Sequence, residues 1–248
     1  MSGARASPDV RIGDRGFVAQ ALAAHVLAEA GRALAEQGTF TIALPGGSVA
    51  SQCFPRLAAL ALDWSRIEFF WVDERAVPPT SPESNYAAAR NLWLEPARVP
   101  GERVHRMPGE ADDLERAARE YAGELQGIAG TPPRLDCVLL GVGPDGHVAS
   151  LFPGHPALLD GRPVLAIEDA PKPPPRRLSL SLPVLAGAAR VAIVAFGEEK
   201  AEVIREALED ARSMLPVARV VRSARRCALL LDRAAASGIR GDSGPAGS

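Results

Sequence analysis

Short, continuous apolar runs alternate along the chain with longer segments in which apolar residues recur every three or four positions. Continuous apolar runs of about four to eight residues are typical of buried β-strands, and the longer period is typical of amphipathic helices. Strands are predicted at 39–44, 67–72, 135–140, 190–196 and 227–231. Helices are predicted at 15–36, from 48 to about 60, and at 84–94, 111–128 and 198–208.

The order of these elements indicates the fold class. Strands that are apolar on both faces and are joined by helices form parallel sheets covered by helices on both sides. We therefore expect an α/β fold, a single three-layer αβα Rossmann-like domain over residues 9–236 with a mostly parallel central sheet. Residues 1–8 are small and polar, and residues 237–248 are rich in glycine and serine, so we expect a flexible N-terminus and a disordered tail.

Charge and composition exclude some classes of partner. The 248 residues carry a formal net charge of -2, which gives no overall attraction to nucleic acid or to an anionic membrane, so an anionic substrate would need a local basic cluster. The first residues lack the apolar core of a signal peptide, and no apolar stretch approaches the roughly 20 residues of a membrane span. The three cysteines form no Cys-x-x-Cys pair. We expect a cytoplasmic monomer or small homo-oligomer with buried, reduced thiols and no nucleic-acid or membrane partner.

Three polar loops follow predicted strands. In open α/β sheets the loops at the carboxyl ends of the strands line the ligand crevice, so we expect the three to converge. The first holds Gly46, Gly47 and Ser48 at the start of a predicted helix, where backbone N–H groups and the positive helix end suit an anion. A plain strand-to-helix turn is the alternative. A Walker P-loop is excluded because no Gly-Lys-Ser/Thr follows.

The second loop is Asp73-Glu74-Arg75. Two carboxylates and a guanidinium at the end of a strand are suited to orienting a histidine, holding sugar hydroxyls or binding phosphate. A surface cluster of ion pairs is the alternative interpretation.

The third loop, residues 141–147, carries His147 two positions after Asp145. Histidine is the usual side chain for moving a proton near neutral pH. A lone histidine is more often structural, but its place on a glycine-rich loop beside a carboxylate favours a general base. The four histidines of the chain show no short ligand spacing, so we expect no metal site.

The third loop also matches the G-x-G-x-x-G pattern of dinucleotide-binding proteins. That pattern needs a long helix starting within it, whereas Pro153-Gly154 interrupts the chain soon afterwards and Pro144 removes a backbone donor. The G-x-S-x-G pentapeptide of serine hydrolases does not occur in the sequence. We therefore expect a site without a cofactor and without a covalent serine mechanism.

In these loops the sequence resembles the 6-phosphogluconolactonase family. The resemblance extends over about residues 10–233 and rests on 44–48 (LPGGS), 69–86 (FFWVDERAVPPTSPESNY), 140–154 (LGVGPDGHVASLFPG), 172–182 (KPPPRRLSLSL) and 197–201 (GEEKA). It departs from the family at four positions that commonly hold threonine, namely Val49, Val148, Ser179 and Ser181. Val49 and Val148 have no hydroxyl group to contact a substrate, so we do not expect them to be ligands.

Glucosamine-6-phosphate deaminase, which is similar in fold, is the main alternative. It shares a glycine-rich phosphate loop, an Asp-Glu pair and an Asp-Gly-His. Here Arg75 follows the acidic pair, where the deaminase pattern has tyrosine. Leu151-Phe152 stands where the deaminase typically has Asn-Glu, and that glutamate belongs to its proton relay. Arg75 and Leu151-Phe152 therefore favour the lactonase.

The resemblance implies hydrolysis of 6-phospho-D-glucono-1,5-lactone to 6-phospho-D-gluconate in the oxidative pentose phosphate pathway. The expected catalytic residues are His147 as general base, Asp145 or Asp73 to orient its ring, and Arg75 or the amides of the third loop as oxyanion donors. A deaminase or isomerase of the same fold and a non-catalytic sugar-phosphate-binding regulator are the alternatives. The expected substrate-binding residues are Gly46, Gly47, Ser48, Gly146, Arg177 and Lys200.

Overall fold

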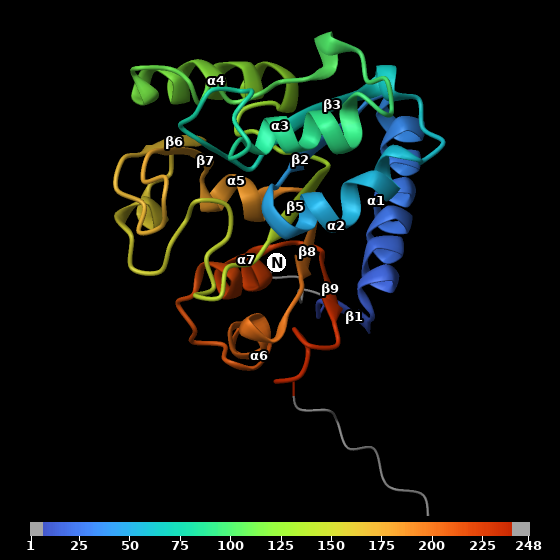
Figure 1. Ribbon diagram of the computed structural model, residues 1–248, viewed down its shortest axis with the longest axis vertical. Helices are drawn as coiled ribbons and strands as arrows, with labels where there is room; N and C mark the ends of the chain where they lie inside the picture. Colours follow the sequence, from blue (N-terminus) through green and yellow to red (C-terminus); the bar gives the residue numbers. More distant parts are fainter. Residues whose placement is uncertain (1–6, 240–248) are drawn as a thin grey trace, which may run out of the picture.

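The computed structural model describes residues 7–239, and a six-stranded parallel sheet runs through its centre (Figure 1). Its strand order is β1-β9-β8-β5-β2-β3. The strands are β1 (Asp9–Gly13), β2 (Phe40–Leu44), β3 (Ile67–Trp71), β5 (Cys137–Gly141), β8 (Arg190–Ala195) and β9 (Cys227–Asp232). Five of them match predicted strands, whereas β1, which is largely exposed at one edge, was not predicted because its polar residues resemble a loop.

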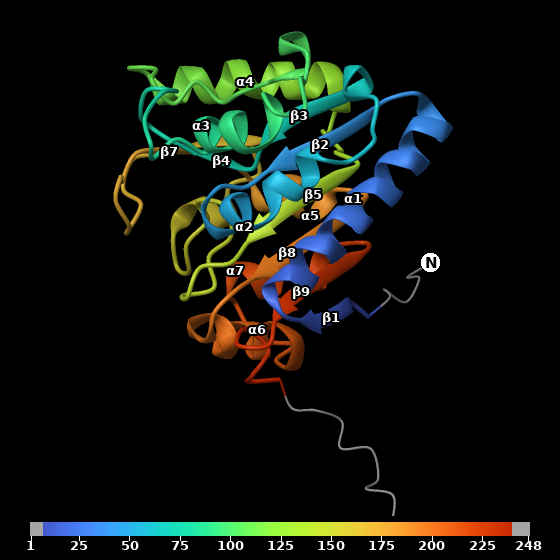
Figure 2. The ribbon, with the colours of Figure 1, turned by 45° about the vertical axis from the view of Figure 1, so that its right-hand side comes forward.

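Helices cover both faces of this sheet, which confirms the predicted α/β fold. On one face lie α1 (Arg15–Gln37) and α2 (Gly47–Ala58), and on the other α5 (Leu182–Gly187) and α7 (Pro216–Ser223), with α6 (Ala201–Glu209) beside α7 (Figure 2). α1 begins and ends as predicted: Asp14 accepts a hydrogen bond from the Phe17 amide at 2.7 Å, and Gly38 ends the helix with a φ of 84°.

A second, three-stranded antiparallel sheet stands beside the first and was not predicted. Its order is β4 (Asp73–Arg75), β7 (Arg177–Leu180), β6 (Val164–Ile167), and α4 (Leu114–Ala129) packs against it. The prediction that Asp73-Glu74-Arg75 forms a loop is therefore wrong. Three polar residues carry no strand signal of their own, and they become a strand only because Asp73 pairs with Ser179 and Arg75 with Arg177.

The remaining elements lie close to their predicted positions. The helix expected at 84–94 is α3 (Asn85–Ala89) followed by a π-helical turn, η2 (Arg90–Leu94). The helix expected at 198–208 begins with a 3-10 turn, η5 (Glu198–Lys200), before α6. Residues 1–6 and 240–248 of the expected flexible ends lie outside the described residues. Within the expected tail, Ser237 and Ile239 donate backbone hydrogen bonds in turns.

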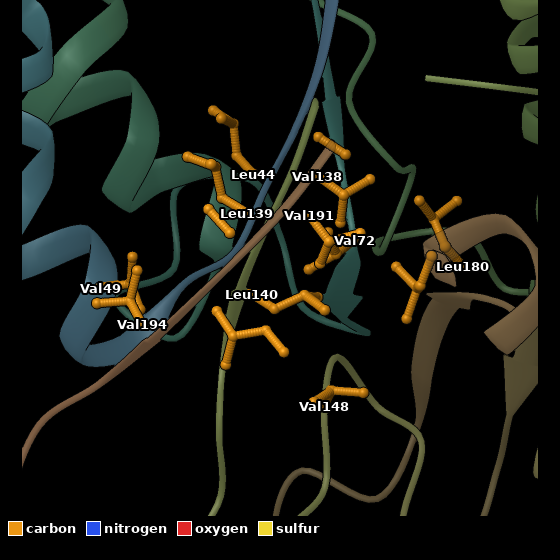
Figure 3. Close-up of a cluster of buried hydrophobic side chains, with 14 of the residues drawn as sticks. Leu44, Val49, Val72, Val138, Leu139, Leu140, Val148, Leu180, Val191 and Val194 are labelled. Carbon is orange, nitrogen blue, oxygen red and sulfur yellow. The ribbon is translucent and has the colours of Figure 1, made fainter. Parts of the chain in front are cut away.

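Buried aliphatic side chains from β2, β5 and β8 form the core directly beneath the carboxyl ends of the strands (Figure 3). Val49 of α2 and Val148 of the loop after β5 belong to this cluster, and each is almost completely buried. Valine at these two positions therefore contributes apolar packing in place of a hydroxyl group.

The chain order of the strands determines where a ligand crevice opens. After β2 the chain moves outward to β3, then returns to the other side of β2 to form β5 and continues through β8 to β9. The order of the sheet thus reverses between β2 and β5. Ligands of open α/β sheets bind at such a point, outside the carboxyl ends of the strands.

Candidate active site

A cavity of about 240 Å³ opens at this point, where β2, β3, β5 and β8 end. The three predicted loops meet there, and the segment after β8 adds Lys200. A cavity at the switch point lined by polar groups from four strands is the expected form of a small-molecule site. The predicted residues that line it are Gly46, Gly47, Ser48, Asp73, Arg75, His147, Arg177 and Lys200.

Two predicted residues lie behind the cavity wall. Asp145 is in contact with the ring of His147. Gly146 has a φ of 79°, its carbonyl accepts a hydrogen bond from the Val217 amide at 3.0 Å, and Leu215 packs over its Cα. The position of Gly146 gives it a structural role in the turn, so we do not include it among the proposed substrate contacts.

The ring of His147 is held on two sides. Its Nδ1 lies 2.5 Å from Asp145 Oδ1, and the Phe152 ring packs against it with the ring centroids 4.6 Å apart. Gly143 makes this approach possible, because a Cβ atom there would lie 1.9 Å from His147 Nδ1. An ionised carboxylate only accepts hydrogen bonds, so Nδ1 carries the ring hydrogen toward Asp145.

The surroundings of the pair favour neutral histidine beside ionised aspartate. Burial lowers the pKa of His147 below its ordinary value; Asp145 opposes this shift, and the charge of Lys172 adds to it. For Asp145, burial alone would raise the pKa, but the hydrogen bonds from His147 and Lys172 outweigh it, and the net shift is downward. Both directions are those expected for an imidazole that accepts a proton near neutral pH.

Asp73 faces the same cavity but does not orient His147. Its Oδ2 accepts a hydrogen bond from Ser150 Oγ at 2.7 Å, and its Oδ1 accepts one from Asn85 Nδ2 at 3.1 Å. The Arg177 guanidinium lies 4.0 Å away. Asp145 therefore holds the ring, and Asp73 is a fixed, buried carboxylate that also lines the cavity.

Glu74, between the two cavity residues of β4, is structural. It is buried, and its carboxylate accepts hydrogen bonds from the backbone N–H groups of Arg75, Asn85 and Tyr86 and from the Ser84 hydroxyl. Burial raises the pKa of Glu74, although these hydrogen bonds oppose the shift. Glu74 thus anchors the start of α3, which carries Asn85 to Asp73.

Positive charge is concentrated at this cavity although the chain as a whole is slightly acidic. Arg75 Nη1 donates to the Glu83 carbonyl, and its Nε is buried without a hydrogen-bond partner among the described residues. Arg177 donates to the backbone carbonyls of 172–174. Lys200 lies 3.2 Å from Glu199, a mostly exposed carboxylate.

The loop after β2 presents backbone N–H groups to the cavity. Gly47 has a φ of 61°, a conformation that favours glycine, and α2 starts there with Ser48 in its first turn. The first N–H groups of a helix lack acceptors within the helix and carry its positive end. This wall can therefore bind an anion.

The other histidines and the cysteines lie away from the cavity. His105 stacks on Phe70 between two glutamates, and His155 caps a short helix and contacts Asp169. Cys53 and Cys137 are buried as predicted, whereas Cys227 is only half-buried. Over residues 7–239, no group of three or more histidine, cysteine, aspartate or glutamate side chains has the arrangement to hold a metal ion.

Two residues at the site were not predicted individually. Asn85 lines the cavity and holds Asp73, and Lys172 contacts Asp145. Each lies within a segment that carries the family resemblance, 69–86 or 172–182, and that was the only signal in the sequence. Neither asparagine after a proline-rich loop nor lysine in a proline cluster indicates a site by itself.

This combination of fold and site defines a family of sugar-phosphate enzymes. The chain belongs to the family described as glucosamine-6-phosphate isomerases/6-phosphogluconolactonase, which matches residues 13–229. Among its relatives, the 6-phosphogluconolactonase of Streptomyces coelicolor is 38% identical over 239 residues, covering 90% of this chain and 91% of that protein. The 6-phosphogluconolactonase of Rattus norvegicus is 41% identical over 208 residues, covering 81% of this chain and 80% of that one. The solved structure of 6-phosphogluconolactonase from Trypanosoma brucei superposes with a TM-score of 0.81 at 28% identity, covering 94% and 99% of the two chains.

Proposed function

We propose that this protein hydrolyses 6-phospho-D-glucono-1,5-lactone to 6-phospho-D-gluconate, a step of the oxidative pentose phosphate pathway. The observation that supports it best is that His147, paired with Asp145, and the start of α2 line one small cavity. The relatives named above are 6-phosphogluconolactonases and match most of this chain.

In this proposal His147 is the general base. Its Nδ1 is engaged by Asp145, so Nε2 is the nitrogen that accepts a proton from water as the water oxygen attacks the lactone carbonyl. General-base catalysis typically contributes about 10²–10⁴-fold. Arg75, which lines the cavity, is the proposed stabiliser of the negative charge that develops on the carbonyl oxygen.

The phosphate lies at the other end of the cavity. The N–H groups of Gly47 and Ser48 and the backbone turn at Gly46 receive it at the start of α2, and Lys200 supplies a charge-assisted contact. Arg177 contributes mainly its charge, because its Nε and Nη2 donate to backbone carbonyls and its Nη1 lies by Ser150 Oγ and Asp73. Lys200 is therefore the cation that we assign to the phosphate, and Arg75 stays with the carbonyl oxygen.

The site favours a lactonase over a deaminase. At the position where the deaminase pattern carries the glutamate of its proton relay, this chain has Phe152, whose ring packs on His147. A phenyl ring transfers no proton, but it buries the imidazole and so helps to keep it neutral.

Two assays with freshly prepared substrates test the proposal. Addition of the lactone should release protons faster than its spontaneous hydrolysis, and addition of glucosamine 6-phosphate should release no ammonia. His147→Gln should lower kcat by about 10²–10⁴-fold with little change in KM. His155→Gln, a histidine outside the cavity, is the matched control and should retain the wild-type rate. Ammonia release, or equal rates for the two variants, would contradict the proposal.

Among the helices within residues 7–239, none combines the length and the apolar character needed to cross a membrane. The cytoplasmic location and the monomeric or small homo-oligomeric state stay predictions. The first is tested by fractionation and the second by light scattering of the purified protein.

A further inference from the structure

Lys172 lies behind the His147–Asp145 pair, in the segment that connects β6 to β7. Its Nζ is 3.2 Å from Asp145 Oδ1 and 3.4 Å from His147 Nδ1. Asp145 Oδ1 therefore accepts hydrogen bonds from the imidazole and from the ammonium group at once. The three side chains form a contiguous Lys–Asp–His group, of which only the histidine lines the cavity.

The backbone around Lys172 is fixed by a buried cation. Arg177 donates from Nη2 to the carbonyls of Lys172 and Pro173, at 3.0 and 3.1 Å, and from Nε to the carbonyl of Pro174 at 2.9 Å. Its side chain is 5% exposed and packs over the Phe152 ring, which in turn packs on His147. Arg177 thus holds the 172–174 segment at a set distance from the histidine.

Lysine itself is rare in this chain. Of the 28 lysine and arginine residues, only Lys172 and Lys200 are lysines, and the other 26 are arginines. A guanidinium forms paired hydrogen bonds with both oxygens of a carboxylate, whereas an ammonium is a compact point charge. An arginine at position 172 would draw the Asp145 carboxylate toward itself and away from Nδ1. The ammonium contacts one oxygen and leaves the His–Asp hydrogen bond intact.

We propose that Lys172 is a positioning residue for the hydrolysis, holding Asp145 against His147 and opposing positive charge on the imidazole, so that His147 gives up the proton it has taken from water. This role rests on the proposed lactone hydrolysis. Arg177 supports it through the backbone and does not need to touch the substrate.

The proposed role follows the proton through the reaction. Water adds its oxygen to C1 of the lactone and gives one proton to Nε2 of His147. The bond between C1 and the ring oxygen then breaks, and the proton on Nε2 passes to that oxygen, which becomes the free hydroxyl. The product acid ionises and releases one proton to solvent. A nearby ammonium makes the imidazolium a stronger acid and therefore favours the second transfer.

Several charges act on His147, and Lys172 is the one that contacts the pair. Asp145 and Asp73 raise the pKa of His147, while burial and Lys172 lower it. Arg75, Arg177 and Lys200 line the same cavity. Because Lys172 is 39% exposed, solvent screens its charge in part, and we expect its removal to raise the pKa of His147 by about one unit.

The test is a proton NMR titration of the histidine rings in the full-length protein, with the His147 signal identified by its loss in His147→Gln. In Lys172→Met the His147 titration should move up by about one pH unit, whereas in Lys172→Arg, which keeps the charge and draws Asp145 toward itself, it should not move up. The acid limb of kcat/KM should move with it, so that Lys172→Met is about tenfold slower at pH values below that limb. Well above the limb it should be slowed by a smaller factor, because only the positioning of Asp145 and the help to the second proton transfer are lost there.

Lys200→Met is the matched control, because it removes the other lysine of the chain. Lys200 lines the cavity but does not contact Asp145. Lys200→Met should shift the His147 titration less than Lys172→Met does. An unchanged titration in Lys172→Met would overturn the role of Lys172. Absence of lactone hydrolysis by the wild-type protein, with the titration shift still present, would refute the proposed reaction and leave the electrostatic coupling standing.

Discussion

Replacing Asp145 by asparagine is the sharpest test of the His–Asp pair. The two side chains are 2.5 Å apart, and the replacement keeps size and removes charge. A pair of unit charges about 4 Å apart is worth about 4 kcal/mol at an effective dielectric constant of about 20 and about 1 kcal/mol in water. Asp145 is 35% exposed, so solvent screens its interaction with the imidazolium. We expect its replacement to cost about 1–2 kcal/mol of that interaction, which is about one unit in the pKa of His147.

The direction of the pH effect follows from the protonation state that the base needs. Neutral His147 is the active form, so activity is lost as the pH falls through the pKa of His147. That pKa is already below its ordinary value, chiefly through burial. Asp145→Asn removes a charge that raises the pKa, so the acid limb of kcat/KM should move to lower pH by about one unit. Lys172→Met moves it in the opposite direction.

The rate above that limb should fall by about 10²–10⁴-fold. Asparagine can donate its amide N–H to Nδ1, which places the ring hydrogen on Nε2 and removes the base from the face that meets water. Initial rates of lactone-dependent proton release over a range of pH measure both effects. An unchanged rate, or an acid limb displaced to higher pH, would refute the reasoning.

Asp169→Asn is the control for this experiment. Asp169 makes a similar contact, 2.9 Å from His155 Nε2, but it is 81% exposed and does not line the cavity. It should leave kcat, KM and the pH profile as they are in the wild type. A similar loss in both variants would indicate a general effect on stability.

The other predictions concern the phosphate end and the turn that carries His147. Lys200→Met should raise KM by about 10–100-fold, the range for a charge-assisted hydrogen bond, with kcat little changed, and steady-state kinetics with a wild-type KM would exclude Lys200 from the phosphate site. Gly143→Ala should lower kcat by at least about 10²-fold, because its Cβ would lie 1.9 Å from His147 Nδ1 and displace the ring. Gly127→Ala is the control, because a Cβ atom at this position of α4 would meet open space. This variant should retain full activity, and its free energy of unfolding, measured by thermal unfolding, should rise by about 0.5–1 kcal/mol.

Local patterns determined most of the secondary structure. α1 was predictable from its period, from Asp14 as its cap and from Gly38 as its end, because all three signals lie within the helix and its flanks. The buried strands were predictable because each is a short, mainly apolar run. β4 was not predictable, since a strand of three polar residues exists only through its pairing with β7.

The sequence also determined which chemical groups are available: a histidine on a glycine-rich turn, a glycine loop before a helix, and cations after two further strands. The tertiary structure decided how they combine. It paired His147 with Asp145 and held Asp73 with Ser150 and Asn85, a choice the sequence left open. It also directed Arg177 to the backbone and brought Lys172 to the pair. The contacts of Asp73 with Ser150 and of Lys172 with Asp145 join segments far apart in the chain. They depend on strand order and side-chain direction, for which a local pattern carries no information.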